Sequence, residues 1–217
     1  MLLAIDVGNT RIKAAVFEVD TLFEVLLFTK EELASKVDFI LQLHPKIKTI
    51  VVASVGNLDK KSFLAFENRV QIQFLSHESK FPFQNLYATP TTLGIDRMVL
   101  AAGAVIRFPN QNRLVIDAGT CITYDFIDAD NTYWGGAISP GLRLRYESLH
   151  QFTAKLPLLT KSYPEKTIGN STQESIHSGV VNGVIHEIDG FIEEYKAQYA
   201  KFIIILTGET QNFWLND

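Results

Sequence analysis

The sequence predicts an α/β protein made of two related halves, each beginning with three consecutive strands. An apolar strand runs into an acidic, glycine-containing turn and out into a second strand at residues 2–13, and the same order returns at residues 114–127. Each set of strands is followed by residues with helical apolar spacing and then by another apolar strand, at 49–54 and 202–206. This repetition indicates duplication of one supersecondary unit.

The first half is expected to contain five strands, at residues 2–5, 11–18, 22–28, 49–54 and 70–75. Helices are expected after Thr29, after Asn57 and from about residue 94 to residue 107. Thr29 and Glu32 have the spacing of a capping box. The apolar residues that mark the buried face of this first helix are Leu33, Val37, Ile40 and Leu41. Pro109 ends the third helix, since it cannot continue one.

The second half is expected to contain strands at residues 114–116, 122–127, 133–138 and 202–206, and helices at 142–150 and 171–200. The longer helix carries apolar residues at helical spacing, namely Ile176, Val180, Val184, Ile188, Phe191 and Tyr195. Three hairpin-connected strands followed by helix–strand units, occurring twice, are typical of tandem ribonuclease-H-like domains with mixed sheets flanked by helices. A short polar connection at 109–112 divides the expected domains into residues 1–110 and 111–217.

Composition excludes several classes of protein. A net charge of -4 gives no electrostatic reason to expect nucleic acid. The single Cys121 excludes an intrachain disulfide and a multi-cysteine zinc site. The N-terminus lacks a basic region, and no apolar run approaches the ~20 residues of a membrane helix. A soluble, cytoplasmic protein without a membrane partner is therefore expected.

The two acidic turns indicate phosphate chemistry. Glycine in a turn between paired strands lets backbone N–H groups point outward, which is a natural seat for phosphate. A carboxylate beside phosphate is repelled by ~4 kcal/mol at ~4 Å and an effective dielectric near 20, unless a cation lies between them. Two such turns therefore predict a nucleotide held between related halves with metal ions, as in an ATP-dependent phosphotransferase. The turn at residues 6–13 is not a Walker A loop, because a strand follows it and the Gly-Lys-Ser/Thr sequence is missing.

Four motifs together resemble type III pantothenate kinase, a family of the actin-like ATPase and sugar-kinase superfamily. They are Asp-Val-Gly-Asn-Thr at 6–10, Gly-Ile-Asp-Arg at 94–97, Asp-Ala-Gly-Thr at 117–120 and Gly-Gly-Ala-Ile-Ser-Pro-Gly at 135–141. The resemblance covers almost the whole chain in the family's order and spacing. It implies transfer of the γ-phosphoryl group of ATP to the 4′-hydroxyl of pantothenate, the first step of coenzyme A biosynthesis. It also implies a homodimer that requires Mg²⁺ and a monovalent cation, K⁺ or NH₄⁺.

The resemblance also assigns roles to individual residues. The ATP-binding residues it implies are Asp6, Val7, Gly8, Asn9, Thr10, Arg11, Ile12, Lys13 and Thr120. Asp6 would orient hydrated Mg²⁺, and Asp117 would hold the monovalent cation. Asp96 would be the general base on the acceptor hydroxyl. The substrate-binding residues are Tyr87, Gly94, Ile95, Asp96, Arg97 and Thr172, with Arg97 suited to pair with the pantothenate carboxylate.

Each motif also has a simpler interpretation. The turn at 6–13 could be a hairpin chosen for geometry, Asp96 an acid stabilised by the helix dipole, and Thr172 only a helix-capping residue. The glycines of 135–141 suit a bent loop as well as a substrate site. The alternative functions are a kinase of another small alcohol and a non-catalytic, nucleotide-binding regulatory relative. A binding module has no use for a general base, which favours the kinase.

Three further expectations concern the C-terminal half. The wide apolar stripe of the helix at 171–200 predicts a symmetric dimer that uses this helix. The sequence departs from the family at Thr207-Gly208-Glu209, where the family usually has Thr-Gly-Gly, and a side chain at Glu209 is expected to affect nucleotide preference. The family normally runs some tens of residues beyond the position of Asp217, so a truncated or reduced C-terminus is expected.

Overall fold

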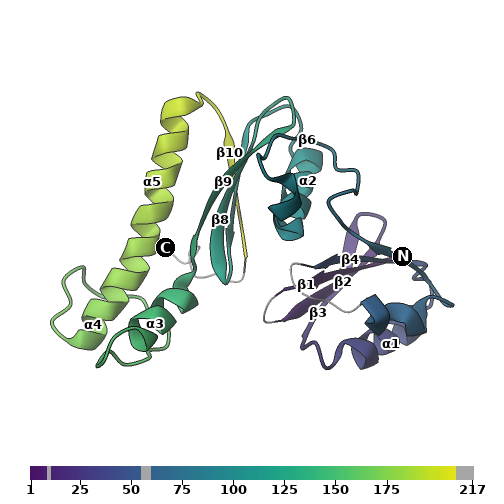
Figure 1. Ribbon diagram of the computed structural model, residues 1–217, viewed down its shortest axis with the longest axis horizontal. Coiled ribbons are helices and arrows are strands. Elements are labelled where there is room, and N and C mark those ends of the chain that lie inside the picture. The colour runs from purple at the N-terminus through teal and green to yellow at the C-terminus, as the bar shows by residue number, and fades with distance from the viewer. Residues whose placement is uncertain (9–10, 55–59, 209–217) are drawn as a thin grey trace. The chain divides into compact units, whose positions relative to one another are not determined.

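The computed structural model describes residues 1–8, 11–54 and 60–208, which pack as two compact units. One unit comprises Met1–Phe81 and Ala88–Leu100, and the other comprises Pro82–Tyr87 and Ala101–Asp217. Each unit contains one five-stranded mixed sheet with flanking helices, which confirms the predicted fold class (Figure 1). Where the sequence suggested a division at residue 110, this grouping assigns residues 82–87 and the second half of the preceding helix to the second unit.

The sheet of the first unit has the strand order β3-β2-β1-β4-β5. Its strands are β1 (Leu2–Val7), β2 (Ile12–Glu18), β3 (Thr21–Phe28), β4 (Thr49–Ser54) and β5 (Gln71–Phe74). Strand β1 is antiparallel to β2 and parallel to β4. All five strands expected in this half are therefore present.

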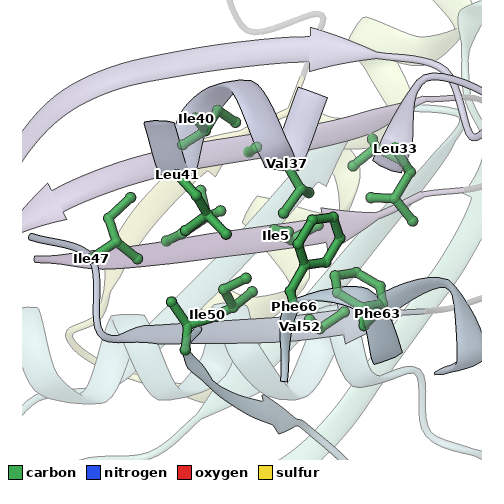
Figure 2. Close-up of a cluster of buried hydrophobic side chains, with 14 of the residues drawn as sticks. Ile5, Leu33, Val37, Ile40, Leu41, Ile47, Ile50, Val52, Phe63 and Phe66 are labelled. Carbon is green, nitrogen blue, oxygen red and sulfur yellow. The ribbon is translucent and has the colours of Figure 1, made fainter. Parts of the chain in front are cut away.

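The core of the first unit lies between this sheet and helix α1 (Leu33–Leu43). Figure 2 shows Leu33, Val37, Ile40 and Leu41 of α1 directed at the sheet, as predicted from their spacing. Half of the capping box forms, since the Thr29 backbone N–H donates to the Glu32 carboxylate at 2.9 Å.

The helix expected after Asn57 forms as a 3₁₀ helix, η1 (Lys60–Phe66), while Asn57 itself lies outside the described residues. A 3₁₀ helix brings positions i and i+3 onto one side. It thereby directs both Phe63 and Phe66 into the core, where they are 0% and 4% exposed (Figure 2).

The second sheet repeats the strand relations of the first and has the order β10-β7-β8-β9-β6. Its strands are β6 (Gln84–Asn85), β7 (Arg113–Ala118), β8 (Cys121–Ile127), β9 (Thr132–Pro140) and β10 (Ile203–Thr207). Strand β7 is antiparallel to β8 and parallel to β10, as β1 is to β2 and β4. The short strand β6 was not expected, because its two residues lie in a proline- and aromatic-rich loop without strand periodicity. It pairs in parallel with the start of β9.

Helices α2 (Ile95–Arg107) and α3 (Leu142–Gln151) form where they were expected. A short 3₁₀ turn, η2 (Pro90–Thr92), precedes α2. The long helix expected at 171–200 is divided into α4 (Thr172–His177), a π-helical segment η3 (Ser178–Asn182) and α5 (Gly183–Gln198). These consecutive helical segments cover one face of the second sheet (Figure 1). Val180 and Val181 of η3 and Val184 of α5 lie in the core. No helix within the described ranges is long and apolar enough to cross a membrane.

Candidate active site

The first acidic turn joins β1 to β2. Ile5 and Val7 of β1 are buried in the core, so the side chain of Asp6 projects from the opposite face of the sheet. Asp6 is paired in register with Lys13 of β2 and with Ala53 of β4. This arrangement puts one cation beside the carboxylate, at the end of the strand where the chain turns.

The glycine of this turn is held by the backbone. The N–H of Gly8 donates to the carbonyl oxygen of Arg11 at 3.1 Å, and a Cβ at Gly8 would lie only 3.1 Å from the same oxygen. Arg11 and Lys13 are exposed, whereas Val7 and Ile12 are buried at 0% exposure, so only the backbone of the latter two could face a ligand. Asn9 and Thr10, two of the expected phosphate contacts, lie outside the described residues.

Asp96 lies in the first turn of α2, also within the first unit. One of its carboxylate oxygens, Oδ1, accepts the backbone N–H of Arg97 at 2.8 Å. A Cβ at Gly94 would lie 2.3 Å from that oxygen, so glycine at this position leaves the space that the carboxylate occupies. Ile95 and Arg97 are buried, at 7% and 5% exposure.

Asp6 and Asp96 are close enough for their charges to interact. Loss of hydration to the surrounding protein raises the pKa of Asp6, although its side chain remains open to solvent, and the negative charge of Asp96 raises it further. Lys13 opposes both effects. Among the residues described, no three His, Cys, Asp or Glu side chains gather as metal ligands. A carboxylate such as that of Asp6 nonetheless fits a hydrated Mg²⁺, which prefers oxygen ligands and retains several waters.

Tyr87 belongs to the second unit and is positioned by β6. The N–H of Leu86 donates to the carbonyl oxygen of Tyr133 at 3.0 Å, and that of Tyr87 donates to Asn85 Oδ1 at 2.9 Å. Gly135 has a φ of +106°, and a Cβ there would lie 3.1 Å from the Tyr87 ring. Glycine at 135 is therefore required both by its backbone conformation and by the ring packed against it.

The second acidic turn joins β7 to β8 and contains Asp117 and Thr120. The register places Asp117 opposite Thr123 of β8 and beside Thr207 of β10. The turn closes through the N–H of Gly119, which donates to the carbonyl oxygen of Cys121 at 3.0 Å. Asp117 thus has two hydroxyl-bearing neighbours in register where Asp6 has Lys13 and Ala53.

Thr172 is the first residue of α4, but the capping contact belongs to its neighbour. Ser171 Oγ accepts the backbone N–H of Glu174 at 3.2 Å, which makes Ser171 the N-cap residue. Thr172 instead lines a cavity of about 840 Å³ in the second unit. Polar lining residues of this cavity include Arg145, Ser148, Asn170, Ser171 and Ser175.

Two hydrogen-bonded acidic residues of the second unit were missed by the sequence analysis. Asp125 is 0% exposed and accepts hydrogen bonds from Thr123 Oγ1 at 3.1 Å and from the Tyr133 hydroxyl at 2.6 Å. Strand alternation could have found it, since Asp125 is two residues from Thr123 and so shares the face of Asp117. Glu187 of α5 is bonded to groups from two strands and another helix. No local pattern in the sequence points to it.

Duplicated sheets with an acidic glycine turn after the first strand of each are the architecture of the actin-like ATPase and sugar-kinase superfamily. A solved structure of a Baf family protein from Campylobacter jejuni has this fold, with a TM-score of 0.60 and 22% identity over 99% of this chain and 86% of the other. A Listeria monocytogenes protein described as a candidate N-acetylmannosamine kinase matches with a TM-score of 0.54 and 12% identity, covering 97% of this chain and 84% of the other. These two likenesses concern the fold alone.

The comparisons by sequence identify the family to which the chain belongs. The family model for type III pantothenate kinase matches residues 2–194. A type III pantothenate kinase of Flavobacterium johnsoniae is 61% identical over 98% of this chain and 87% of its own length. One from Christiangramia forsetii is 45% identical over 96% of this chain and 86% of its own length. The chain belongs to the type III pantothenate kinase family, whose members are phosphotransferases that phosphorylate pantothenate in coenzyme A biosynthesis.

The raised pKa of Asp6 predicts a stability change. The unfolded chain ionises Asp6 more readily than the folded protein does, so ionisation costs stability. This cost is absent below the ordinary aspartate pKa of about 4 and fully present above the raised folded value. In Mg²⁺-free buffer at pH 7, Asp6→Asn should therefore melt at a higher temperature than the wild type, and the gain should disappear at acidic pH.

The control is Asp20→Asn, a change at an exposed turn between β2 and β3. This variant should melt like the wild type at both pH values. An Asp6→Asn variant no more stable than the wild type at pH 7 would contradict the raised pKa of Asp6.

Proposed function

We propose that this protein transfers the γ-phosphoryl group of ATP to the 4′-hydroxyl of pantothenate, with Asp96 as the general base. The observation that carries the proposal is the Asp96 carboxylate held at the start of α2, where Oδ1 accepts the Arg97 N–H at 2.8 Å and Gly94 leaves room for it, in a chain that matches the type III pantothenate kinase family model. The negative charge of Asp96 also raises the pKa of Asp6, and a cation that accompanies ATP would offset this repulsion.

Asp96 is suited to the role of base by its local geometry. The Arg97 N–H fixes Oδ1 at 2.8 Å, which orients the carboxylate and leaves Oδ2 to accept the proton of the pantothenate hydroxyl. Phosphoryl transfer passes through a loose transition state, so positioning of the acceptor matters more than its activation. The buried guanidinium of Arg97 would pair with the pantothenate carboxylate. Tyr87, Gly94, Ile95 and Thr172 would complete the substrate contacts.

ATP would be bound by residues 6–13 and by Thr120, with backbone N–H groups of the two glycine turns facing phosphate oxygens. Asp6 would hold Mg²⁺ through its water ligands, because a direct carboxylate–phosphate contact is repulsive. Bound Mg²⁺ would supply neutralisation of the charge that develops on the phosphate oxygens. The exposed Lys13, in register with Asp6, would add a positive charge at the same turn.

Asp117 would hold a monovalent cation, K⁺ or NH₄⁺. Its two neighbours in register, Thr123 and Thr207, carry hydroxyl oxygens, whereas the equivalent Asp6 has the ammonium of Lys13 across the strand. Together with the Asp117 carboxylate, these hydroxyl oxygens would offer oxygen ligands to such a cation.

A homodimer in the cytoplasm completes the proposal. Several large apolar side chains of the second unit remain exposed, among them Ile168 and Phe152 at 84% and Ile138 at 61%. The apolar residues Ile185 and Ile192 of α5 are only partly buried. A second copy would cover such surface through a symmetric interface that includes α5.

Light scattering at micromolar concentration should give the mass of a dimer, and the mass of a monomer would refute the interface.

The role of Asp96 is tested by Asp96→Asn, which preserves shape but cannot take the proton. General-base assistance is worth ~10²–10⁴ in rate, so kcat should fall within that range. The KM for pantothenate should change much less, and ATP binding should be nearly intact. If Asp96 only begins a helix, the change should cost at most about 1 kcal/mol of stability and leave turnover near the wild-type value.

The matched control is Asp20→Asn, at the exposed turn between β2 and β3. Its kcat and melting temperature should both equal those of the wild type. Normal turnover in Asp96→Asn would remove Asp96 from the mechanism.

The cation site is tested by replacing K⁺ with Na⁺. Activity should fall about tenfold or more, since an uncompensated repulsion of ~1.4 kcal/mol in the transition state already gives that factor. Asp117→Asn should lose both activity and dependence on the cation. Full turnover of the wild type in buffer containing only Na⁺ would show that Asp117 does not use K⁺.

A further inference from the structure

A polar cluster around Glu187 connects α5 to the second sheet. Oε1 of Glu187 accepts hydrogen bonds from the Tyr124 hydroxyl of β8 at 3.0 Å and from Ser139 Oγ of β9 at 2.5 Å. Oε2 accepts a bond from Arg145 Nη2 of α3 at 2.5 Å. The carboxylate is thus bound to two strands and one helix, and it is mostly buried, with its side chain 24% exposed.

The same cluster holds the chain segment that follows β9. The Nε–H of Arg145 donates to the carbonyl oxygen of Pro140 at 2.8 Å. Glu187 therefore fixes this segment twice, directly through Ser139 and indirectly through the Arg145 guanidinium. Since the guanidinium is planar and rigid, orienting Nη2 on Glu187 also orients Nε on Pro140.

The next residue, Gly141, rests against the second phosphate turn. Its N–H donates to the carbonyl oxygen of Thr120 at 3.0 Å. A Cβ at Gly141 would lie 2.3 Å from the carbonyl oxygen of Gly119 and 2.6 Å from that of Thr120. The two backbones are therefore in direct contact, and any shift of Gly141 must move the turn. Because the peptide unit is planar, holding the Thr120 carbonyl also fixes the plane of the 120–121 peptide.

We infer that Glu187 is a positioning residue for ATP binding, acting through Arg145, Ser139 and Gly141 on the turn that contains Thr120. The inference rests on the proposed function, in which Thr120 contacts the phosphates of ATP. Glu187 does not contact ATP itself. It positions the backbone of the turn that contains Thr120, and this turn contacts ATP.

A charged carboxylate is needed for this role rather than any side chain that fills the space. Hydrogen bonds to ionised groups contribute more than those between neutral groups, and removing one partner leaves the other buried and unsatisfied. Burial alone would raise the pKa of Glu187, but the bonds from Ser139, Arg145 and Tyr124 outweigh it and lower that pKa. The carboxylate therefore stays ionised at neutral pH and keeps Arg145 in place.

The test compares Glu187→Ala and Glu187→Gln with Val184→Ala in steady-state assays of the full chain, at a temperature where all variants are folded. Val184 is fully buried one turn earlier on α5, so its truncation reduces stability without touching the cluster. Glu187→Ala should raise the KM for ATP roughly tenfold while the KM for pantothenate stays within about twofold. Glu187→Gln retains an acceptor for Tyr124 and Ser139 and should show a smaller increase. Val184→Ala should lower the melting temperature but keep the wild-type KM for ATP.

Loss of stability in Glu187→Ala with an unchanged KM for ATP would overturn the inference, since a purely structural residue behaves like Val184. Thr120→Val separates this result from a failure of the proposed function. If Thr120→Val raises the KM for ATP and Glu187→Ala does not, the turn binds ATP but Glu187 does not position it. If Thr120→Val leaves the KM for ATP unchanged, the assignment of the turn has failed and the route through Glu187 fails with it.

Discussion

The first unit holds the carboxylates of Asp6 and Asp96 where the negative charge of Asp96 raises the pKa of Asp6, and the candidate site depends on this placement. Both side chains must stay where their charges oppose each other, and other parts of the unit hold them there. Ile5 and Val7, buried on either side of Asp6, fix the end of β1. Gly94 leaves the space that Asp96 fills. Such local cost to stability is typical of sites that bind charged ligands, because an optimally stable arrangement would have no need of a cation.

The second unit repeats the strand pairing of the first, but the residues beside its aspartate differ. Both units place an aspartate near the end of a strand that has an antiparallel neighbour on one side and a parallel neighbour on the other. The residue across the antiparallel pair is Lys13 in one unit and Thr123 in the other. The two turns therefore differ in the charge of the residue that lies across from the aspartate.

Elements whose residues face a core were predictable from the sequence, because alternation and helical spacing record which side is buried. The four apolar residues of α1 and the three strands at the start of each half are examples. Features set by contacts between distant segments were not. Strand β6 depends on pairing with β9, and the 3₁₀ form of η1 depends on the places that the core offers to Phe63 and Phe66. The same distinction applies to the candidate site: the turn residues and Asp125 follow local strand patterns, whereas the partners of Glu187 lie more than 40 residues away in the sequence.

The central claim is that Asp6 and Asp96 repel each other in the protein without Mg²⁺. A double-mutant cycle measures this directly, using urea unfolding of the wild type, Asp6→Asn, Asp96→Asn and the double variant at pH 7. Either single substitution removes the whole repulsion, so the account predicts that the two single changes in unfolding free energy sum to a more stabilising value than the double change. Additive changes would show that the two carboxylates do not interact, and would contradict the account.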